Sequence, residues 1–102
     1  MSTDTEINID QDIKLGLKPP DLWKVVFLND DKTPMEFVIT LLVELFGHSE
    51  DKAKEITVEI HNTGSGIAGI YTYEIAEQKG IDATKVSQAN GHPLRIQIEK
   101  DQ

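Results

Sequence analysis

The stretch that decides the fold reads Asn29-Asp30-Asp31-Lys32-Thr33-Pro34-Met35-Glu36-Phe37-Val38. It follows Leu22–Leu28, a run of bulky, β-branched and aromatic residues that predicts a largely buried strand. The polar triplet that opens the stretch ends that strand, because short polar side chains favour turns and compete for local backbone groups. Thr33 is expected to cap a helix, with Pro34 in the first helical position and Glu36 completing a Thr-x-x-Glu capping box. The stretch therefore predicts a strand, a polar turn and a helix in direct succession.

The segments after this junction also show clear periodicity. Apolar residues at helical spacing extend the first helix to about Gly47, where a glycine favours its end. The sequence then predicts, in order, a helix capped by Ser49 and reaching about Asn62, a strand Ser65–Tyr71, a helix capped by Thr72, and a strand in which Leu94, Ile96 and Ile98 alternate with polar residues. The order β-α-α-β-α-β predicts an α+β fold: one compact domain with a small three-stranded sheet and helices on one side.

Two parts of the chain depart from these regular patterns. Gly80 lies inside the predicted third helix, and because a helical glycine costs about 1 kcal/mol relative to alanine, we expect that helix to be weakened or kinked there. Met1–Leu17 is acidic and poor in apolar residues, which predicts a disordered or loosely attached extension. We therefore divide the chain into a flexible extension, residues 1–17, and a core domain, residues 18–102.

Composition excludes several classes of function. The chain has 102 residues, a net charge of −8 and only ten Lys and Arg residues, which argues against nucleic acid, since phosphate backbones require clustered cationic side chains. Cysteine is absent, so a disulfide, a thiolate metal site and a cysteine nucleophile are excluded. No apolar run approaches the roughly 20 residues of a membrane span, and the acidic amino terminus does not resemble a signal peptide. We expect a cytoplasmic protein with cationic partners, of which a peptide α-amino group is one.

Several short strings occur in an order that is typical of one family. The junction quoted above is accompanied by Lys18-Pro19-Pro20, Val58-Glu59-Ile60-His61, Gly69-Ile70-Tyr71-Thr72-x-Glu74-Ile75-Ala76-Glu77-x-Lys79 and Gly91-His92-Pro93-Leu94. From Lys18 to about Lys100 the chain resembles the ClpS family, whose members are adaptors that deliver substrates with destabilising N-terminal residues to a Clp-type AAA+ protease. The resemblance implies a binding protein that is not an enzyme and needs no cofactor or metal.

A site for an N-terminal residue must satisfy two different groups. The α-ammonium group needs hydrogen-bond acceptors, and the side chain beside it needs an apolar cavity. The resemblance assigns the amine contacts to Asn29, His61 and an acidic residue of the pair Asp30 and Asp31. It assigns the cavity to Met35, Val38, Ile60 and Leu94, with Leu28, Thr33 and Thr57 beside them. The expected ligands are Leu, Phe, Tyr and Trp.

Thr57 departs from the family pattern, because the usual member has a methionine at that position. Threonine is shorter, branched and polar. We therefore expect the range of accepted N-terminal residues to differ from that of the family, with the amine site unchanged.

The resemblance also implies a second binding surface. It places docking to the N-terminal domain of the protease's AAA+ unfoldase on the third helix, around Glu74 and Lys79. Without the resemblance, both residues would be interpreted as ordinary solvated charges on an exposed helix face.

The residues alone leave two other kinds of site open. A carboxylate of the Asp pair with His61 would suit a small acid–base enzyme, although no activated serine or cysteine nucleophile accompanies it. Asp30, Asp31, His61 and His92 include suitable metal ligands, although their spacing matches no known metal motif.

Overall fold

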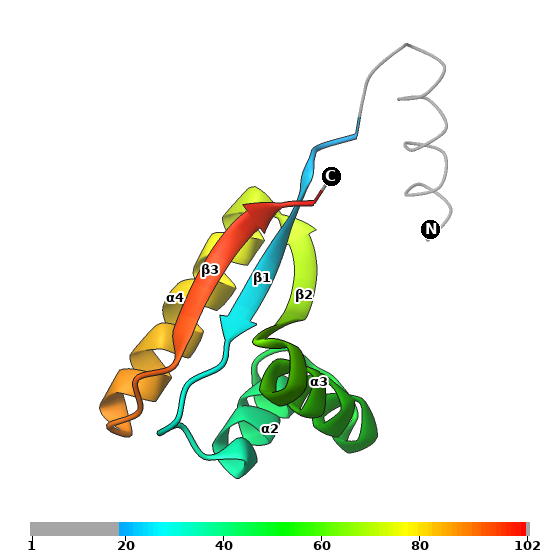
Figure 1. Ribbon diagram of the computed structural model, residues 1–102. Helices are drawn as coiled ribbons and strands as arrows, with labels where there is room; N and C mark the ends of the chain where they lie inside the picture. Colours follow the sequence, from blue (N-terminus) through cyan, green and yellow to red (C-terminus); the bar gives the residue numbers. More distant parts are fainter. Residues whose placement is uncertain (1–18, 102) are drawn as a thin grey trace, which may run out of the picture.

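The computed structural model describes residues 19–101, so the extension predicted for Met1–Leu17 lies outside the described part. The elements follow the predicted order β-α-α-β-α-β (Figure 1). They are β1 (Leu22–Leu28), α2 (Met35–Glu44), α3 (Glu50–Thr63), β2 (Ser65–Thr72), α4 (Tyr73–Ala89) and β3 (Arg95–Lys100). The prediction of a single α+β domain with a three-stranded sheet is confirmed.

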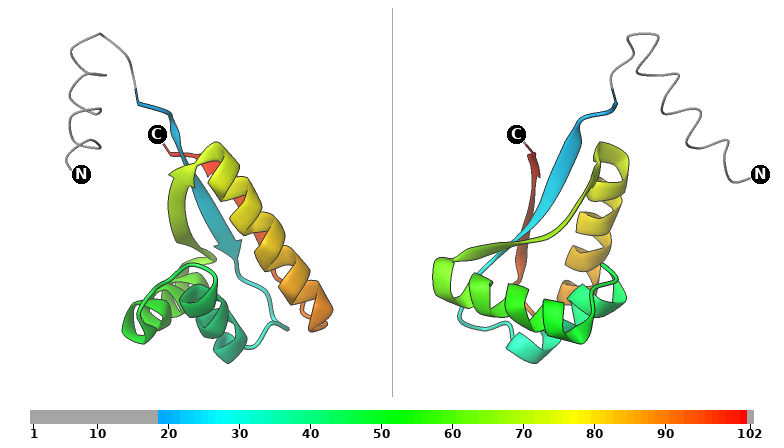
Figure 2. Two further views of the ribbon diagram at one scale, coloured as in Figure 1. Left: turned by 180° about the vertical axis from the view of Figure 1, so that it is seen from behind. Right: turned by 90° about the vertical axis from the view of Figure 1, so that its right-hand side faces the viewer.

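The sheet has the strand order β2-β1-β3, and both neighbours run antiparallel to β1. α4 packs across one face of the sheet, as the views from behind and from the side show (Figure 2). α2 and α3 pack against each other at the end of the sheet where β1 ends and β2 begins (Figures 1 and 2). The turn between β1 and α2 therefore lies where the central strand meets the helix pair.

The hydrophobic core lies between the sheet and the three helices. Alternation along β1 turns Val25 and Phe27 inward, and both are completely buried. Phe27 makes an edge-to-face contact with Phe46, which follows α2, at 5.4 Å between ring centroids. Leu42 of α2 is also completely buried. Core packing thus continues along β1 up to the residues that precede the polar turn.

The predicted capping box at the start of α2 is wrong. α2 begins at Met35, Pro34 occupies the N-cap position, and no side chain makes a capping hydrogen bond. The Thr33 hydroxyl instead donates to the Asp30 carboxylate at 2.8 Å. The Thr33 N–H also donates to this carboxylate, at 2.7 Å, and two hydrogen bonds to an ionised group hold Thr33 in the preceding turn.

The other predicted helix boundaries agree more closely with the structure. Ser49 caps α3 as predicted, accepting a hydrogen bond from the backbone N–H of Lys52 at 3.1 Å. Thr72 is the N-cap residue of α4, but its side chain makes no capping hydrogen bond. Gly47 follows α2 with a φ of 74°, a left-handed conformation that favours glycine.

The predicted weakening or kink at Gly80 is not seen, because α4 continues through it without interruption (Figure 2). Gly80 is buried against β3, and a Cβ atom added there would lie 3.3 Å from Cδ1 of Ile98. The glycine therefore allows α4 to approach the sheet closely, and this packing offsets its low helix propensity.

Within residues 19–101, none of the helices combines the length and apolarity that crossing a bilayer requires.

Candidate functional site

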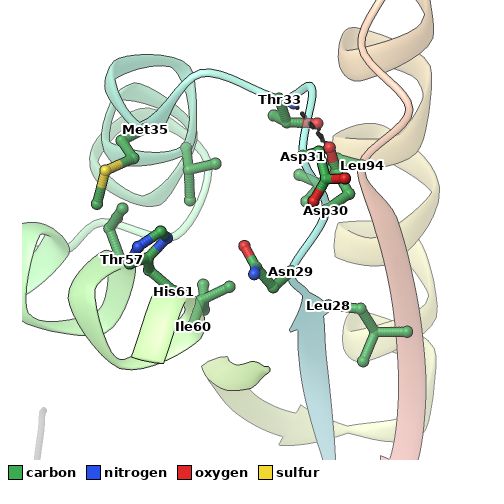
Figure 3. A pocket seen from close by; sticks show the side chains of 11 residues that line it. Leu28, Asn29, Asp30, Asp31, Thr33, Met35, Thr57, Ile60, His61 and Leu94 are labelled. Atoms are coloured by element: carbon green, nitrogen blue, oxygen red, sulfur yellow. Dashed lines mark hydrogen bonds between the residues drawn. The ribbon is translucent and has the colours of Figure 1, made fainter. Parts of the chain in front are cut away.

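A pocket with a cavity volume of about 340 Å³ lies between the β1–α2 turn and α3 (Figure 3). Its lining comes from the end of β1 and the turn, the start of α2, one face of α3, and the residue before β3. The lining residues are Leu28, Asn29, Asp30, Asp31, Thr33, Met35, Val38, Thr57, Ile60, His61 and Leu94. The structure thus brings together every residue that the sequence analysis assigned to the amine site and the apolar cavity.

The inner wall of the pocket is apolar, and one apolar side chain also lies at its opening. Val38, Ile60 and Leu94 are buried, and each contributes an aliphatic side chain. Met35 lies at the opening and is 44% exposed. A thioether side chain in that position adapts its shape at little cost. The cavity can therefore hold an apolar group of moderate size.

At the edge of the pocket, three polar side chains make no contact of the hydrogen-bonding or ionic kind with the described part of the chain. Asn29, Asp31 and His61 are exposed, and their side chains make no hydrogen bond or salt bridge to any residue between 19 and 101. Figure 3 shows the Asn29 amide facing the His61 ring across the pocket, with Asp31 on the side of the turn. Their acceptor groups are therefore free to bind a ligand.

Asn29 is fixed through its backbone. Its N–H donates to the carbonyl of Gly64 at 2.9 Å. Gly64 is the C-cap of α3, with a φ of 97°, three residues after His61. This bond connects the end of β1 to the end of α3 and so fixes the spacing between Asn29 and His61. Gly64 was not predicted to be part of the site, although a glycine shortly after a pocket residue indicates that the helix ends there.

The Asp30 carboxylate organises the turn through three hydrogen bonds. It accepts hydrogen bonds from the N–H groups of Lys32 and Thr33, both at 2.7 Å, and from the Thr33 hydroxyl. Burial alone would raise the pKa of Asp30, but these hydrogen bonds and the nearby charge of His92 outweigh it and hold the pKa below its ordinary value. The carboxylate is thus ionised, and its oxygens already accept hydrogen bonds from residues of the turn.

The lowered pKa of Asp30 predicts a specific acid sensitivity. A carboxyl whose pKa is lower in the folded state stabilises the fold above its ordinary value of 3.8, and the contribution is lost as the pH falls through the folded pKa. Asp30→Asn should therefore lower the melting temperature at neutral pH, and the difference from wild type should shrink once the pH falls below 3.8. Thermal melts over a pH series test this. A difference that stays constant in acid would contradict it.

Thr57 is almost completely buried, at 3% exposure, and its hydroxyl donates to the carbonyl of Ala53 at 2.8 Å. It lies one helical turn before His61 and on the same face of α3. Because the hydroxyl proton is used within the helix, Thr57 acts as a short side chain in the pocket wall and not as a donor to a ligand.

His92 lies beside the pocket but is not one of its lining residues. Its ring contacts the ring of Phe37 at 4.5 Å between centroids, and its backbone N–H donates to the carbonyl of Ser87. Among the described residues, no three His, Asp or Glu side chains are placed to share a metal ion. The four-residue metal site left open by the sequence is therefore not assembled in this part of the chain.

The match to a known family extends over most of the chain. A family model described as "ATP-dependent Clp protease adaptor protein ClpS" matches residues 18–97. The chain belongs to the ClpS family. The ClpS adapter protein of Gluconobacter oxydans is 44% identical over 84 residues, which cover 82% of this chain and 71% of that protein. The ClpS adapter protein of Sodalis glossinidius is 37% identical over 89% of this chain and 86% of its own length.

A solved structure of a ClpS protein has the same fold. It is Agrobacterium tumefaciens ClpS2 bound to L-phenylalaninamide, which superposes with a TM-score of 0.78 at 37% identity and covers 81% of this chain and 100% of its own. The sequence-based assignment to the ClpS family is thereby confirmed.

The two residues that the ClpS resemblance assigned to protease docking differ in their surroundings. Glu74 is exposed in the first turn of α4, beside the exposed side chains of Tyr73 and Ile75. Lys79 is partly buried, and its ammonium group donates to the carbonyl of Leu45 at 2.6 Å. Leu45 is the C-cap of α2, so Lys79 connects α4 to a helix terminus that favours cations.

The same ammonium group lies 6.0 Å from the ring centroid of Phe46 and 5.9 Å from that of Tyr71. Lys79 is therefore engaged inside the ClpS fold, whereas the exposed Glu74 side chain makes no hydrogen bond or salt bridge within residues 19–101.

Proposed function

We propose that this ClpS-family adaptor binds substrate proteins by their first residue and delivers them to a Clp-type AAA+ protease. The observation that carries the proposal is the pocket itself, in which three unpartnered acceptor side chains border an apolar cavity of about 340 Å³. Such a combination suits a molecule that is cationic at one atom and apolar at the next. The N-terminal residue of a protein has both properties when its α-amino group is protonated and its side chain is apolar.

The proposed amine contacts are Asn29, Asp31 and His61. A protonated α-amino group carries three N–H donors, as a lysine ammonium does. The Asn29 amide oxygen, the Asp31 carboxylate and an unprotonated nitrogen of His61 supply three acceptors. Asp31 is the acidic residue of the pair that we assign to the amine, because the Asp30 carboxylate already accepts hydrogen bonds from Lys32 and Thr33.

The proposed ligands are substrates that begin with Leu, Phe, Tyr or Trp. Their side chains would enter the cavity formed by Val38, Ile60 and Leu94, with Met35 adapting its shape at the opening. Support comes from the related ClpS2, whose bound L-phenylalaninamide has a free α-amine next to an aromatic side chain.

A peptide array tests the proposed function against the other two classes of site. Immobilised peptides that differ only in their first residue should retain the protein when that residue is Leu, Phe, Tyr or Trp, and should not when it is Gly, Ser or Asp. Each retained peptide should be recovered chemically unchanged, and retention should survive a chelator. Conversion of the peptide would indicate an enzyme, and loss of binding with chelator would indicate a metal site. Retention independent of the first residue would refute the proposal.

We further propose that recognition and delivery use different parts of the chain. Glu74 on α4 would contact the N-terminal domain of the unfoldase in the cytoplasm, with Tyr73 and Ile75 beside it, and Lys79 would support this surface by anchoring α4 to α2. Residues 1–17, which have too little apolar content to join a core, would engage the unfoldase during transfer.

This division of roles gives a prediction for degradation assays. A chain beginning at Lys18 and the full chain carrying Glu74→Lys should both bind N-terminal peptides with unchanged affinity, because neither change touches the pocket. Both should fail to accelerate degradation of a reporter protein that begins with Phe by the partner protease. The control is Glu59→Lys, a charge reversal on an exposed residue of α3. Full delivery by the shortened chain would refute the role of the extension.

A further inference from the structure

Gly66 has no side chain at a point where β2 touches the pocket wall. It is buried opposite Phe27 of β1, and its nearest neighbours outside the strand belong to α3. A Cβ atom added to Gly66 would lie 2.7 Å from Cγ1 of Ile60 and 3.4 Å from the carbonyl oxygen of Ile56. The first distance is far shorter than carbon atoms in contact allow. The missing side chain of Gly66 is therefore what permits the observed position of Ile60.

Ile60 is also a wall of the pocket. It is 4% exposed, it lines the cavity, and it separates the cavity from the start of β2 (Figure 3). Its Cγ1 atom is next to the branch point of the side chain and cannot swing away freely, since χ1 of isoleucine is strongly restricted in a helix. Any atom added on the β2 side must therefore move Ile60, or the helix that carries it, toward the cavity.

We infer that Gly66 sets the depth of the pocket and is a specificity-determining residue. Gly66 does not contact the ligand. It acts indirectly, because its missing side chain allows Ile60 to pack against β2 and away from the cavity. The inference rests on the proposed function, because it concerns which N-terminal side chains the same pocket accepts. The deep pocket favours Trp and Phe, whose rings need the space that Ile60 leaves. The Leu side chain is shorter, so its binding depends less on this space.

The positive φ that requires glycine elsewhere in the chain is absent at Gly66, so alanine is compatible with its backbone. Gly66→Ala should shift Ile60 into the cavity. We expect its affinity for peptides beginning with Trp and Phe to fall about tenfold relative to Leu, since one methylene in an apolar pocket is worth roughly 10- to 200-fold in discrimination.

Three further variants distinguish a change in pocket depth from a general loss of stability. Gly66→Ala combined with Ile60→Ala removes the Cγ1 atom that the added methyl group would meet, so nothing is pushed into the cavity and most of the binding to Trp should return. Ile60→Val alone should raise the ratio of Trp to Leu affinity. Gly69→Ala is the matched control in the same strand: its added Cβ would meet the Tyr71 ring and not the pocket, so the ratio should not change.

Fluorescence anisotropy with peptides beginning with Trp, Phe and Leu measures these ratios, and thermal melts check that each variant is folded. A preference for Trp that falls in Gly66→Ala and returns in the double variant supports the inference. An equal change for all peptides, or an unchanged ratio in both Gly66→Ala and Ile60→Val, overturns it while leaving the proposed function intact. Failure of the wild-type protein to prefer large apolar first residues at all would overturn both.

Discussion

Asp31→Ala should weaken binding to a peptide with a free amino terminus about 10- to 100-fold, because a hydrogen bond between charged groups contributes roughly 1.5–3 kcal/mol. The melting temperature should stay unchanged, since the Asp31 carboxylate is exposed and binds no other described side chain or backbone group. Titration of a fluorescent peptide beginning with Phe, together with a thermal melt, measures both quantities.

Asp30→Ala is the matched control, because it removes the neighbouring carboxylate. That carboxylate accepts hydrogen bonds from Lys32 and Thr33, so its loss should lower the melting temperature. The two adjacent aspartates are therefore expected to differ, with one acting mainly on binding and the other mainly on stability. Unchanged peptide affinity in Asp31→Ala would show that Asp31 does not bind the amine.

Thr57→Met should narrow the range of N-terminal residues that the pocket accepts. The longer side chain would have to extend into the cavity, because Thr57 is buried and packed on its other sides. Branched Ile and Val should lose about tenfold in affinity relative to Leu, the effect expected for filling a space the size of one methylene group. The wild-type protein should accordingly discriminate against Ile and Val less than the methionine variant does.

Thr57→Val provides the control for the chemistry of this side chain. It preserves the branched shape and replaces only the hydroxyl, which donates to Ala53 and not to the pocket, with a methyl group. The ratio of Ile to Leu affinity should therefore match that of wild type. If Thr57→Met leaves the same ratio unchanged, Thr57 does not contact the ligand near its Cβ atom.

The order of elements could be predicted from the sequence because local signals and periodicity agreed. Leu22–Leu28 forms β1 with the predicted bounds, and Ser49 caps α3 as its position before Glu50 and Asp51 indicated. The start of α2 was predicted less well. Thr33 has the right spacing for a cap, but in the folded turn its hydroxyl donates to Asp30, and sequence spacing does not show that contact.

The candidate site was predicted through family resemblance, and its geometry came only from the structure. Periodicity alone would have placed Val38 and Ile60 in the ordinary core, because a pocket wall and a core position share the same apolar pattern. The sequence also could not distinguish the roles of Asp30 and Asp31, since they are adjacent and chemically identical. The distinction arises from hydrogen bonds that form only when the turn is closed.

Lys79 and Gly80 show a second limit of sequence analysis. A lysine on an amphipathic helix is usually solvated, yet Lys79 reaches the carbonyl of Leu45, which is distant in sequence. A glycine in a helix usually weakens it, yet Gly80 allows α4 to pack against Ile98. Both outcomes depend on which element lies opposite the helix, and local patterns contain no information about that.

The proposed function requires the pocket to recognise a free α-amino group beside an apolar side chain. One pair of fluorescent peptides tests it most directly: both begin with Phe and have identical sequences, and one carries an acetylated amino terminus. Acetylation removes the charge and two of the three N–H donors while leaving the Phe side chain in place. We expect saturable binding of the free peptide, with no measurable binding of the acetylated peptide at the same protein concentrations. Equal affinity for the two peptides would contradict it.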